Sequence, residues 1–121
     1  MAFFETGEVE AARDAHVACL KLAPGHLGAR VALCHVLRIL GDLRGAVRQG
    51  MTALSQAPGD ADSLYALGLA HHARGDDSVA TGYLEAFLAT APELDVVVQV
   101  RELLATIQPS REGGNEGDEA S

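Results

Sequence analysis

The sequence predicts an all-α protein built from antiparallel helix pairs, and two observations support this fold class. First, the 121-residue chain contains 21 alanines and 16 leucines, whereas aromatic residues make up only 4% of it. Alanine and leucine lead the scale of helix propensities, while strand-rich chains favour valine, isoleucine, threonine and aromatic residues. Second, the chain repeats itself at an interval of 34 residues. A chain of this length can bury a core as one domain.

Three kinds of residue mark the repeat, each at the same interval. Glycine, alanine and proline recur at Gly7, Gly41 and Gly75, at Ala12, Ala46 and Ala80, and at Pro24, Pro58 and Pro92. Each proline ends the same five-residue motif, Leu-x-x-Ala-Pro, and each glycine is followed by an acidic residue. Three independent positions of the repeat therefore keep their residue type in all three copies, and chance does not explain this agreement.

The repeated residues predict where each helix begins and ends. Glycine allows the left-handed backbone that ends many helices, and the acidic residue after it suits the positive start of the next helix. Proline lacks an amide hydrogen and clashes with the preceding turn, so it stops a helix. Between these stops the sequence predicts six helices, at about residues 8–22, 27–40, 43–56, 61–74, 77–90 and 94–107. The first repeat supplies only its second helix, so that copy is incomplete.

These helices predict one domain, residues 1–109, followed by a short tail, residues 110–121. The domain divides into a partial repeat at about 7–26, complete repeats at 27–60 and 61–94, and a capping helix at 94–107. The tail lacks apolar content and carries −3 of the net charge of −8, so we expect it to be acidic and disordered. The remaining net charge of −5 on the domain is ordinary for a soluble protein.

The repeat resembles the tetratricopeptide repeat (TPR) family, and the resemblance covers about residues 7–108. One complete copy reads Leu64-x-x-Leu67-Gly68-x-x-His71, followed by Ala80-x-x-x-Leu84 and Pro92. The other reads Arg30-x-x-Leu33-Cys34-x-x-Leu37, followed by Ala46-x-x-x-Gly50 and Pro58. The resemblance implies a right-handed α-solenoid, a TPR-like superhelix of antiparallel helix pairs whose first helices line a concave groove.

Both complete copies depart from the usual pattern of that family. Leu64 and Arg30 stand where a tryptophan is usual, and His71 and Leu37 stand where a tyrosine is usual. A large residue of the second helix is replaced by Gly50 in one copy. These departures predict an interface between the paired helices that is locally thinner and packed through alanine and glycine.

The resemblance places the partner-binding residues on the face of the first helices that points away from their paired helices. A helix packed on one side only should be polar on this face, yet here the face is half apolar. The expected groove residues are Val31, His35, Arg38, Ile39, Tyr65, Leu69, His72, Gln99 and Leu103. The alternative, that the apolar residues of this face pack against neighbouring helices, stays open, and we prefer it for Ala32, Ala66, Ala73 and Val100.

Composition and motifs argue against several other classes of function. The acidic net charge and the scattered basic residues predict no nucleic-acid partner. Runs without charged residues reach only eleven residues, whereas a membrane span needs about 20 apolar residues. No catalytic or phosphate-binding motif occurs, and adjacent His71 and His72 point about 100° apart on a helix, so we expect no enzyme, cofactor or metal site. Cys19 and Cys34 are expected to be reduced thiols in a cytoplasmic protein.

The incomplete first repeat predicts an open N-terminal edge, because a solenoid unit does not bury its apolar face alone. Phe3, Phe4, Val9, Val17 and Leu20 would need a cover there. One interpretation is a homodimer or a hetero-complex through this edge. The other is that Phe3 and Phe4 fold over the edge, or that the chain is a fragment of a longer solenoid.

The predicted function is that of a non-enzymatic scaffold or adaptor, which holds a peptide or a helix of a protein partner in the concave groove. The alternative is a small chaperone or assembly factor for one client, because some bacterial secretion chaperones are similar in size and repeat type. A third interpretation is a fragment that regulates a larger enzyme. The carboxylate clamp known in the family needs several lysine, arginine and asparagine residues, and only Arg38 is present, so that mode of binding is not expected.

Overall fold

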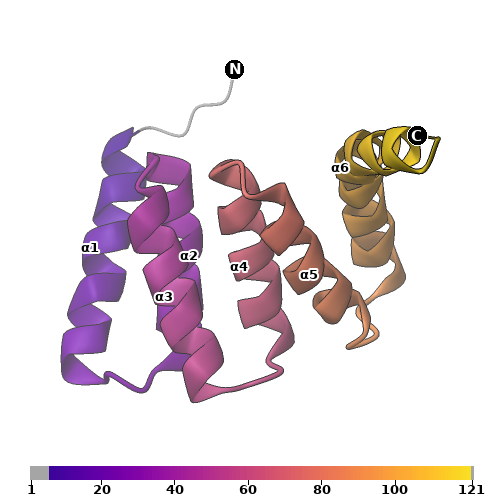
Figure 1. Ribbon diagram of the computed structural model, residues 1–121. Helices are drawn as coiled ribbons and strands as arrows, with labels where there is room; N and C mark the ends of the chain where they lie inside the picture. Colours follow the sequence, from indigo (N-terminus) through magenta and orange to yellow (C-terminus); the bar gives the residue numbers. More distant parts are fainter. Residues whose placement is uncertain (1–5, 121) are drawn as a thin grey trace.

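Residues 6–120 form six α-helices that run up and down in succession along the molecule (Figure 1). The computed structural model describes the backbone of residues 6–120 and the side chains of residues 7–107. The helices are α1 Thr6–Leu22, α2 Leu27–Leu40, α3 Leu43–Gln56, α4 Ala61–Ala73, α5 Asp77–Leu88 and α6 Leu94–Ala120. Every regular element within residues 6–120 is an α-helix, which confirms the predicted all-α class.

The helix boundaries lie close to those predicted from the glycine and proline columns. Helices α2 and α3 have the predicted bounds, while α1 begins two residues earlier, at Thr6. Helices α4 and α5 end slightly early, at Ala73 and Leu88. Helix α6 begins where predicted but continues to Ala120, beyond the predicted end at residue 107. The prediction of a disordered tail at 110–121 falls on residues whose side chains are not described, so it stays a prediction.

Three helices begin at a side chain that caps the first turn. The Asp42 carboxylate accepts a hydrogen bond from the Gly45 amide at 3.0 Å, and Asp60 does the same for the Ser63 amide at 2.9 Å. The ring of His26 caps α2 in the same way, through its Nδ1 atom. These bonds satisfy amide groups that have no partner inside the helix. Of the acidic residues that follow the repeated glycines, Asp42 therefore caps α3, whereas Asp76 makes no side-chain cap at α5. Asp60, which caps α4, is not one of these repeated acidic residues.

Two helices end at the repeated glycines. Gly41 and Gly75 have φ angles of 91° and 89°, a left-handed backbone that glycine adopts without a steric penalty. The next amide then bonds back to the last turn, from Asp42 to the Leu37 carbonyl at 2.9 Å and from Asp76 to the His71 carbonyl at 2.9 Å. This arrangement satisfies carbonyl groups at the helix end and turns the chain into the next helix.

Each helix packs against the next one along the chain, and α2 also packs against α4. The Cα atoms of α2 and α4 approach within 8 Å, whereas α4 and α6 show no such approach in the described part of the chain. Figure 1 shows α6 set apart from the helices before it. The interval between α4 and α6 is therefore wider than the interval between α2 and α4.

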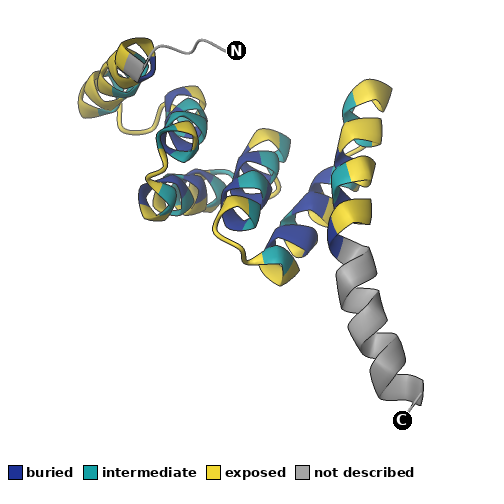
Figure 2. Ribbon diagram, turned by 90° about the horizontal axis from the view of Figure 1, so that it is seen from above, coloured by how far each residue is buried: buried dark blue, intermediate teal, exposed yellow. Residues whose placement is uncertain are grey.

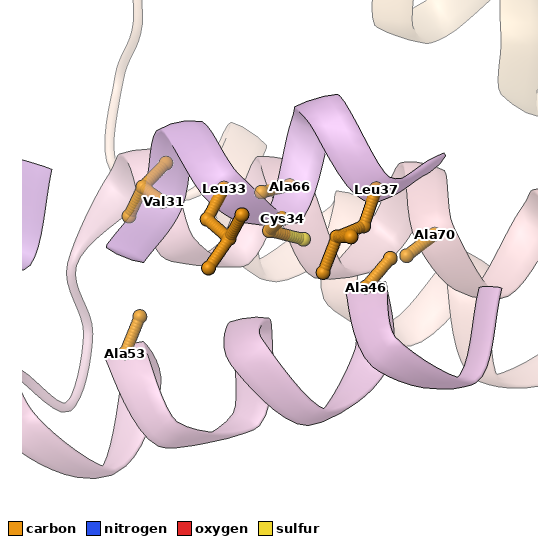
Figure 3. Close-up of a cluster of buried hydrophobic side chains, with 8 residues drawn as sticks. All are labelled: Val31, Leu33, Cys34, Leu37, Ala46, Ala53, Ala66 and Ala70. Carbon is orange, nitrogen blue, oxygen red and sulfur yellow. The ribbon is translucent and has the colours of Figure 1, made fainter. Parts of the chain in front are cut away.

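The buried side chains form two clusters, one on each side of α4. The first core cluster lies between α2, α3 and α4 and consists of Val31, Leu33, Cys34, Leu37, Ala46, Ala53, Ala66 and Ala70 (Figure 3). The second core cluster joins α4, α5 and α6 and consists of Leu64, Leu84, Phe87, Val100 and Leu104. Four alanines of the first cluster are fully buried, because small side chains let neighbouring helices approach closely. Of the four residues expected to pack between helices, Ala66 and Val100 are buried, Ala32 is half-buried, and Ala73 is exposed, so the expectation is wrong for Ala73.

The N-terminal edge is less open than the sequence predicted. Val9 is buried and Leu20 packs against the first core cluster, so two of the side chains expected to need a cover are covered within the chain. Val17 remains exposed, and exposed residues cover most of α1 (Figure 2). Phe3 and Phe4 lie outside the described residues. A homodimer through this edge stays a prediction.

Candidate partner-binding groove

Two hollows open on the side of the molecule formed by α2, α4 and α6. The α4/α6 hollow has a volume of about 460 Å³, and its walls include Asp62, Tyr65, Phe87, Glu93, Val96 and Gln99. The α2/α4 hollow has a volume of about 330 Å³, and its walls include Leu27, Val31, Ala32, His35, Asp60 and Asp62. Both volumes are in the range, from about 300 Å³ upward, of sites that receive small ligands or side chains. Asp62 borders both hollows, so the two are neighbours.

A row of three rings runs past the two hollows. The centroids of the Tyr65 and Phe87 rings are 5.0 Å apart with an angle of 43° between their planes, and the rings of His35 and Tyr65 are 6.1 Å apart. Tilted pairs at these distances are favourable arrangements of aromatic rings. The row connects α2, α4 and α5, and it gives the α4/α6 hollow an aromatic wall.

His35 is held by Arg38, one turn further along α2. A nitrogen of the Arg38 guanidinium lies 3.2 Å from His35 Nδ1. A guanidinium only donates hydrogen bonds, so Nδ1 is the acceptor, and neutral His35 carries its proton on Nε2. Burial lowers the pKa of His35, and the charge of Arg38 lowers it further, while Asp62 acts in the opposite direction. The ring is therefore neutral at neutral pH and offers Nε2–H as a donor.

The charged groups that line the two hollows are acidic. Asp60 uses its carboxylate within the chain, where it accepts from the amide and the hydroxyl of Ser63. Asp62 and Glu93 are exposed, and no hydrogen bond or ion pair involves their carboxylates within residues 7–107. The described walls of both hollows contain no lysine or arginine. This side of the molecule is therefore suited to a positively charged ligand.

Four of the nine predicted groove residues line the hollows, namely Val31, His35, Tyr65 and Gln99. Val31 differs from the expectation, because it is only 9% exposed and belongs to the first core cluster. The approach of α4 to α2 covers most of its side chain. Tyr65 and Gln99 lie in the same hollow although 34 residues separate them, as the repeat predicts.

The other five predicted groove residues do not line either hollow. Leu103 packs against the second core cluster, and His72 is engaged by Asp77, with 2.9 Å between His72 Nδ1 and an Asp77 carboxylate oxygen. Ile39 is 49% exposed at the end of α2, and Arg38 is turned toward His35. Leu69 is half-buried on α4. These residues share the helical spacing of the predicted face. However, they lie away from the two hollows, contact neighbouring side chains, or pack into the core.

Most side chains of the α4/α6 hollow were not among the predicted groove residues, and the missed ones include Asp62, Phe87, Glu93 and Val96. Phe87 occupies a position that holds Cys19 and Ala53 in the two earlier copies, so the third copy places an aromatic ring where the others have small residues. This change of residue type was visible in the sequence and could have predicted an aromatic side chain beside α4. Glu93 follows Pro92 directly, and nothing in the spacing of the repeat marks it.

His71 stands where the resembled repeat usually has a tyrosine, and its Nδ1 atom has no hydrogen-bond partner among the described residues. The ring is buried and stacks on Tyr83, with centroids 5.5 Å apart and planes 15° apart. Its Nδ1 atom lies 3.6 Å from the Asp76 carboxylate, too far for a hydrogen bond. The ring is therefore held by stacking and by a longer electrostatic contact.

Among residues 7–107 no three or more histidine, cysteine, aspartate or glutamate side chains are grouped to hold a metal ion. No described helix combines the length and the apolar character required to cross a membrane. Cys19 and Cys34 are both free thiols.

A scan against protein-family models and a search of curated proteins both find no match to this chain.

Proposed function

We propose that this chain is a protein-interaction module that holds a segment of a partner protein against α2, α4 and α6. In this proposal the helix pairs form a right-handed α-solenoid of tetratricopeptide type, and the two hollows are parts of its concave groove. The starts of α2, α4 and α6, at Leu27, Ala61 and Leu94, are 34 and 33 residues apart, which supports the repeat, as does the packing of α2 against α4. The proposal places the module in the cytoplasm and requires no cofactor or metal.

The observation that carries the proposal is the pair of neighbouring hollows that share Asp62. A peptide or a helix that lies across α2, α4 and α6 can insert one side chain into each hollow. Recognition of this kind places alternate or helically spaced side chains of the ligand into adjacent pockets. Tyr65 stands beside both hollows through its contacts with His35 and Phe87, and tyrosine is among the residues that contribute most to protein interfaces.

The experiment is affinity capture of the partner by the wild-type chain and by two variants, Tyr65→Ala and Gln99→Arg, at residues that both line the α4/α6 hollow. Both changes alter the proposed groove, so both should reduce capture at least tenfold while the circular dichroism signal of the helices persists. Met51→Arg on α3 is the control, because Met51 is exposed and belongs to neither hollow. Unchanged capture by folded groove variants would show that the partner binds elsewhere. A client that is stable only when co-expressed with the chain would support the assembly-factor interpretation instead.

A further inference from the structure

We infer that the α4/α6 hollow receives an arginine side chain of the partner segment. This inference rests on the proposed function and specifies the chemistry of the ligand. Three features of the hollow support it: its aromatic wall, two carboxylates that make no hydrogen bond or ion pair within residues 7–107, and the charge at the helix ends beside it.

The aromatic wall suits a flat cation. Tyr65 is half-buried and lines the hollow, the Phe87 ring 5.0 Å from it is only 5% exposed and supports it from the core, and Val96 adds an apolar surface from α6. A guanidinium group is planar and weakly hydrated, so it stacks on aromatic faces at a smaller desolvation cost than an ammonium group. The aliphatic part of an arginine side chain would meanwhile contact the apolar wall. The volume of about 460 Å³ is sufficient for such a side chain.

The two carboxylates supply the opposite charge. Asp62 stands on α4 and Glu93 directly before α6, so they approach the hollow from two different elements. Neither makes a hydrogen bond or an ion pair within residues 7–107. A guanidinium carries five donors in a fixed fork that matches carboxylate oxygens. An acidic ligand would be repelled here, and a purely apolar ligand would remove Asp62 and Glu93 from water without a partner.

The helix ends beside the hollow do not cancel this negative charge. Helices α4 and α6 both begin here, and each start is equivalent to about half a positive charge. The Asp60 carboxylate already caps α4, and the Asp95 carboxylate accepts a hydrogen bond from the Val96 amide at the start of α6. The negative charges of Asp62 and Glu93 therefore exceed the partial positive charge of the two helix starts, which Asp60 and Asp95 already balance. A cation from the partner would balance them.

The test is selection of random eight-residue peptides on the immobilised wild-type chain. We expect the selected peptides to share an arginine, and we expect replacement of that arginine by lysine to weaken binding about threefold and by glutamate at least tenfold. Selected peptides that share an apolar or acidic position and tolerate loss of arginine would overturn the inference but leave the proposed function intact. Failure to select any peptide that Tyr65→Ala weakens would count against both.

A double variant, Asp62→Asn with Glu93→Gln, locates the binding site. It should bind the selected arginine peptide about five- to tenfold more weakly, as expected for two partly exposed ion pairs, and the loss should shrink at 0.5 M salt. The control is Glu8→Gln with Glu10→Gln, which removes the same charge from exposed positions on α1. Equal affinity of both double variants for the arginine peptide would overturn the assignment to this hollow. Neither carboxylate has a partner within residues 7–107, so the variant is expected to fold.

Discussion

Gly68 on α4 lies directly against the side chain of Leu84 on α5, so that a Cβ atom added to Gly68 would come within 2.6 Å of Leu84 Cδ2. One repeat earlier the same two positions hold Cys34 and Gly50, so the glycine is on the second helix instead of the first. A Cβ atom on Gly50 would come within 3.3 Å of Cys34 Sγ. Each helix pair therefore combines one small and one larger residue at this point, which conserves volume at the interface.

The relationship predicts opposite effects of alanine at two helical glycines. A Cβ atom on Gly50 would meet Leu67 Cγ at 2.8 Å, and Leu67 is fully buried and has no space to move. Gly50→Ala should therefore lower the free energy of unfolding by about 1–3 kcal/mol, despite the higher helix propensity of alanine. Gly82→Ala on α5 meets nothing within 4 Å and should raise it by about 0.5–1 kcal/mol. Urea denaturation of both variants measures the difference, and stabilisation by Gly50→Ala would contradict the packing described.

The helices of this protein are predictable because their ends are local features of the chain. Gly41 and Asp42 end one helix and start the next through a left-handed backbone and a capping carboxylate, and both properties belong to the residue types themselves. Pro58 directly follows Ala57, the C-cap residue of α3, and a proline at this point prevents the helix from continuing. For this reason α2 and α3 have the bounds that the repeat predicts.

The candidate groove is less predictable because it depends on distances between helices. Helical spacing alone placed Val31 and Tyr65 on the same face, as equivalent residues of two repeats. Close packing of α4 on α2 buries Val31, while the wider interval between α4 and α6 leaves Tyr65 beside a hollow. The spacing of the repeat is the same in both copies, so it does not predict that the two intervals between helices differ in width. Phe87 contributes to the wider interval between α4 and α6, because a large ring stands where the preceding copy has Ala53.

Removal of the Asp60 side chain should destabilise the fold more than removal of Asp76. Asp60 accepts hydrogen bonds from the amide and the hydroxyl of Ser63, at 2.9 and 2.7 Å. Asp76 makes no side-chain cap at α5, and its contacts with His71 and Arg74 are 3.6 and 3.8 Å long. Asp60→Ala should cost about 1–2 kcal/mol and Asp76→Ala less than about 0.5 kcal/mol. Thermal unfolding followed by circular dichroism compares the two, and equal losses would contradict the assignment of the cap.

The two cysteines should differ strongly in reactivity. Cys34 is fully buried in the first core cluster, and burial raises the pKa of its thiol to about 11. Alkylation requires an accessible thiolate, so iodoacetamide at pH 8 should modify only Cys19 in the folded chain and both residues in guanidinium chloride. Mass spectrometry counts the added groups. Labelling of a Cys19→Ser variant under native conditions, at a rate near that of wild-type Cys19, would contradict the burial of Cys34.

Acidification should destabilise the fold through His35. Burial, and then the charge of Arg38, hold the pKa of His35 below its ordinary value of 6.5. As the pH falls through 6.5, the unfolded chain takes up a proton at this site before the folded chain does. The contribution of His35 to the free energy of unfolding is therefore unchanged above that pH and decreases below it. The decrease from this single group is at most about 1.4 kcal/mol per pH unit, and it ends below the pKa of the folded state.

Two variants separate the causes of this pH dependence. His35→Gln retains an acceptor for Arg38 but does not titrate, so its free energy of unfolding should change less than that of the wild type between pH 8 and pH 5.5. Arg38→Met removes the smaller of the two causes, because burial is the larger one, and should reduce the change only in part. Urea denaturation at half-unit steps of pH gives the three curves. Parallel curves for the wild type and His35→Gln would show that protonation of His35 is not coupled to unfolding, and that its ring is not held between Arg38 and Tyr65 as described.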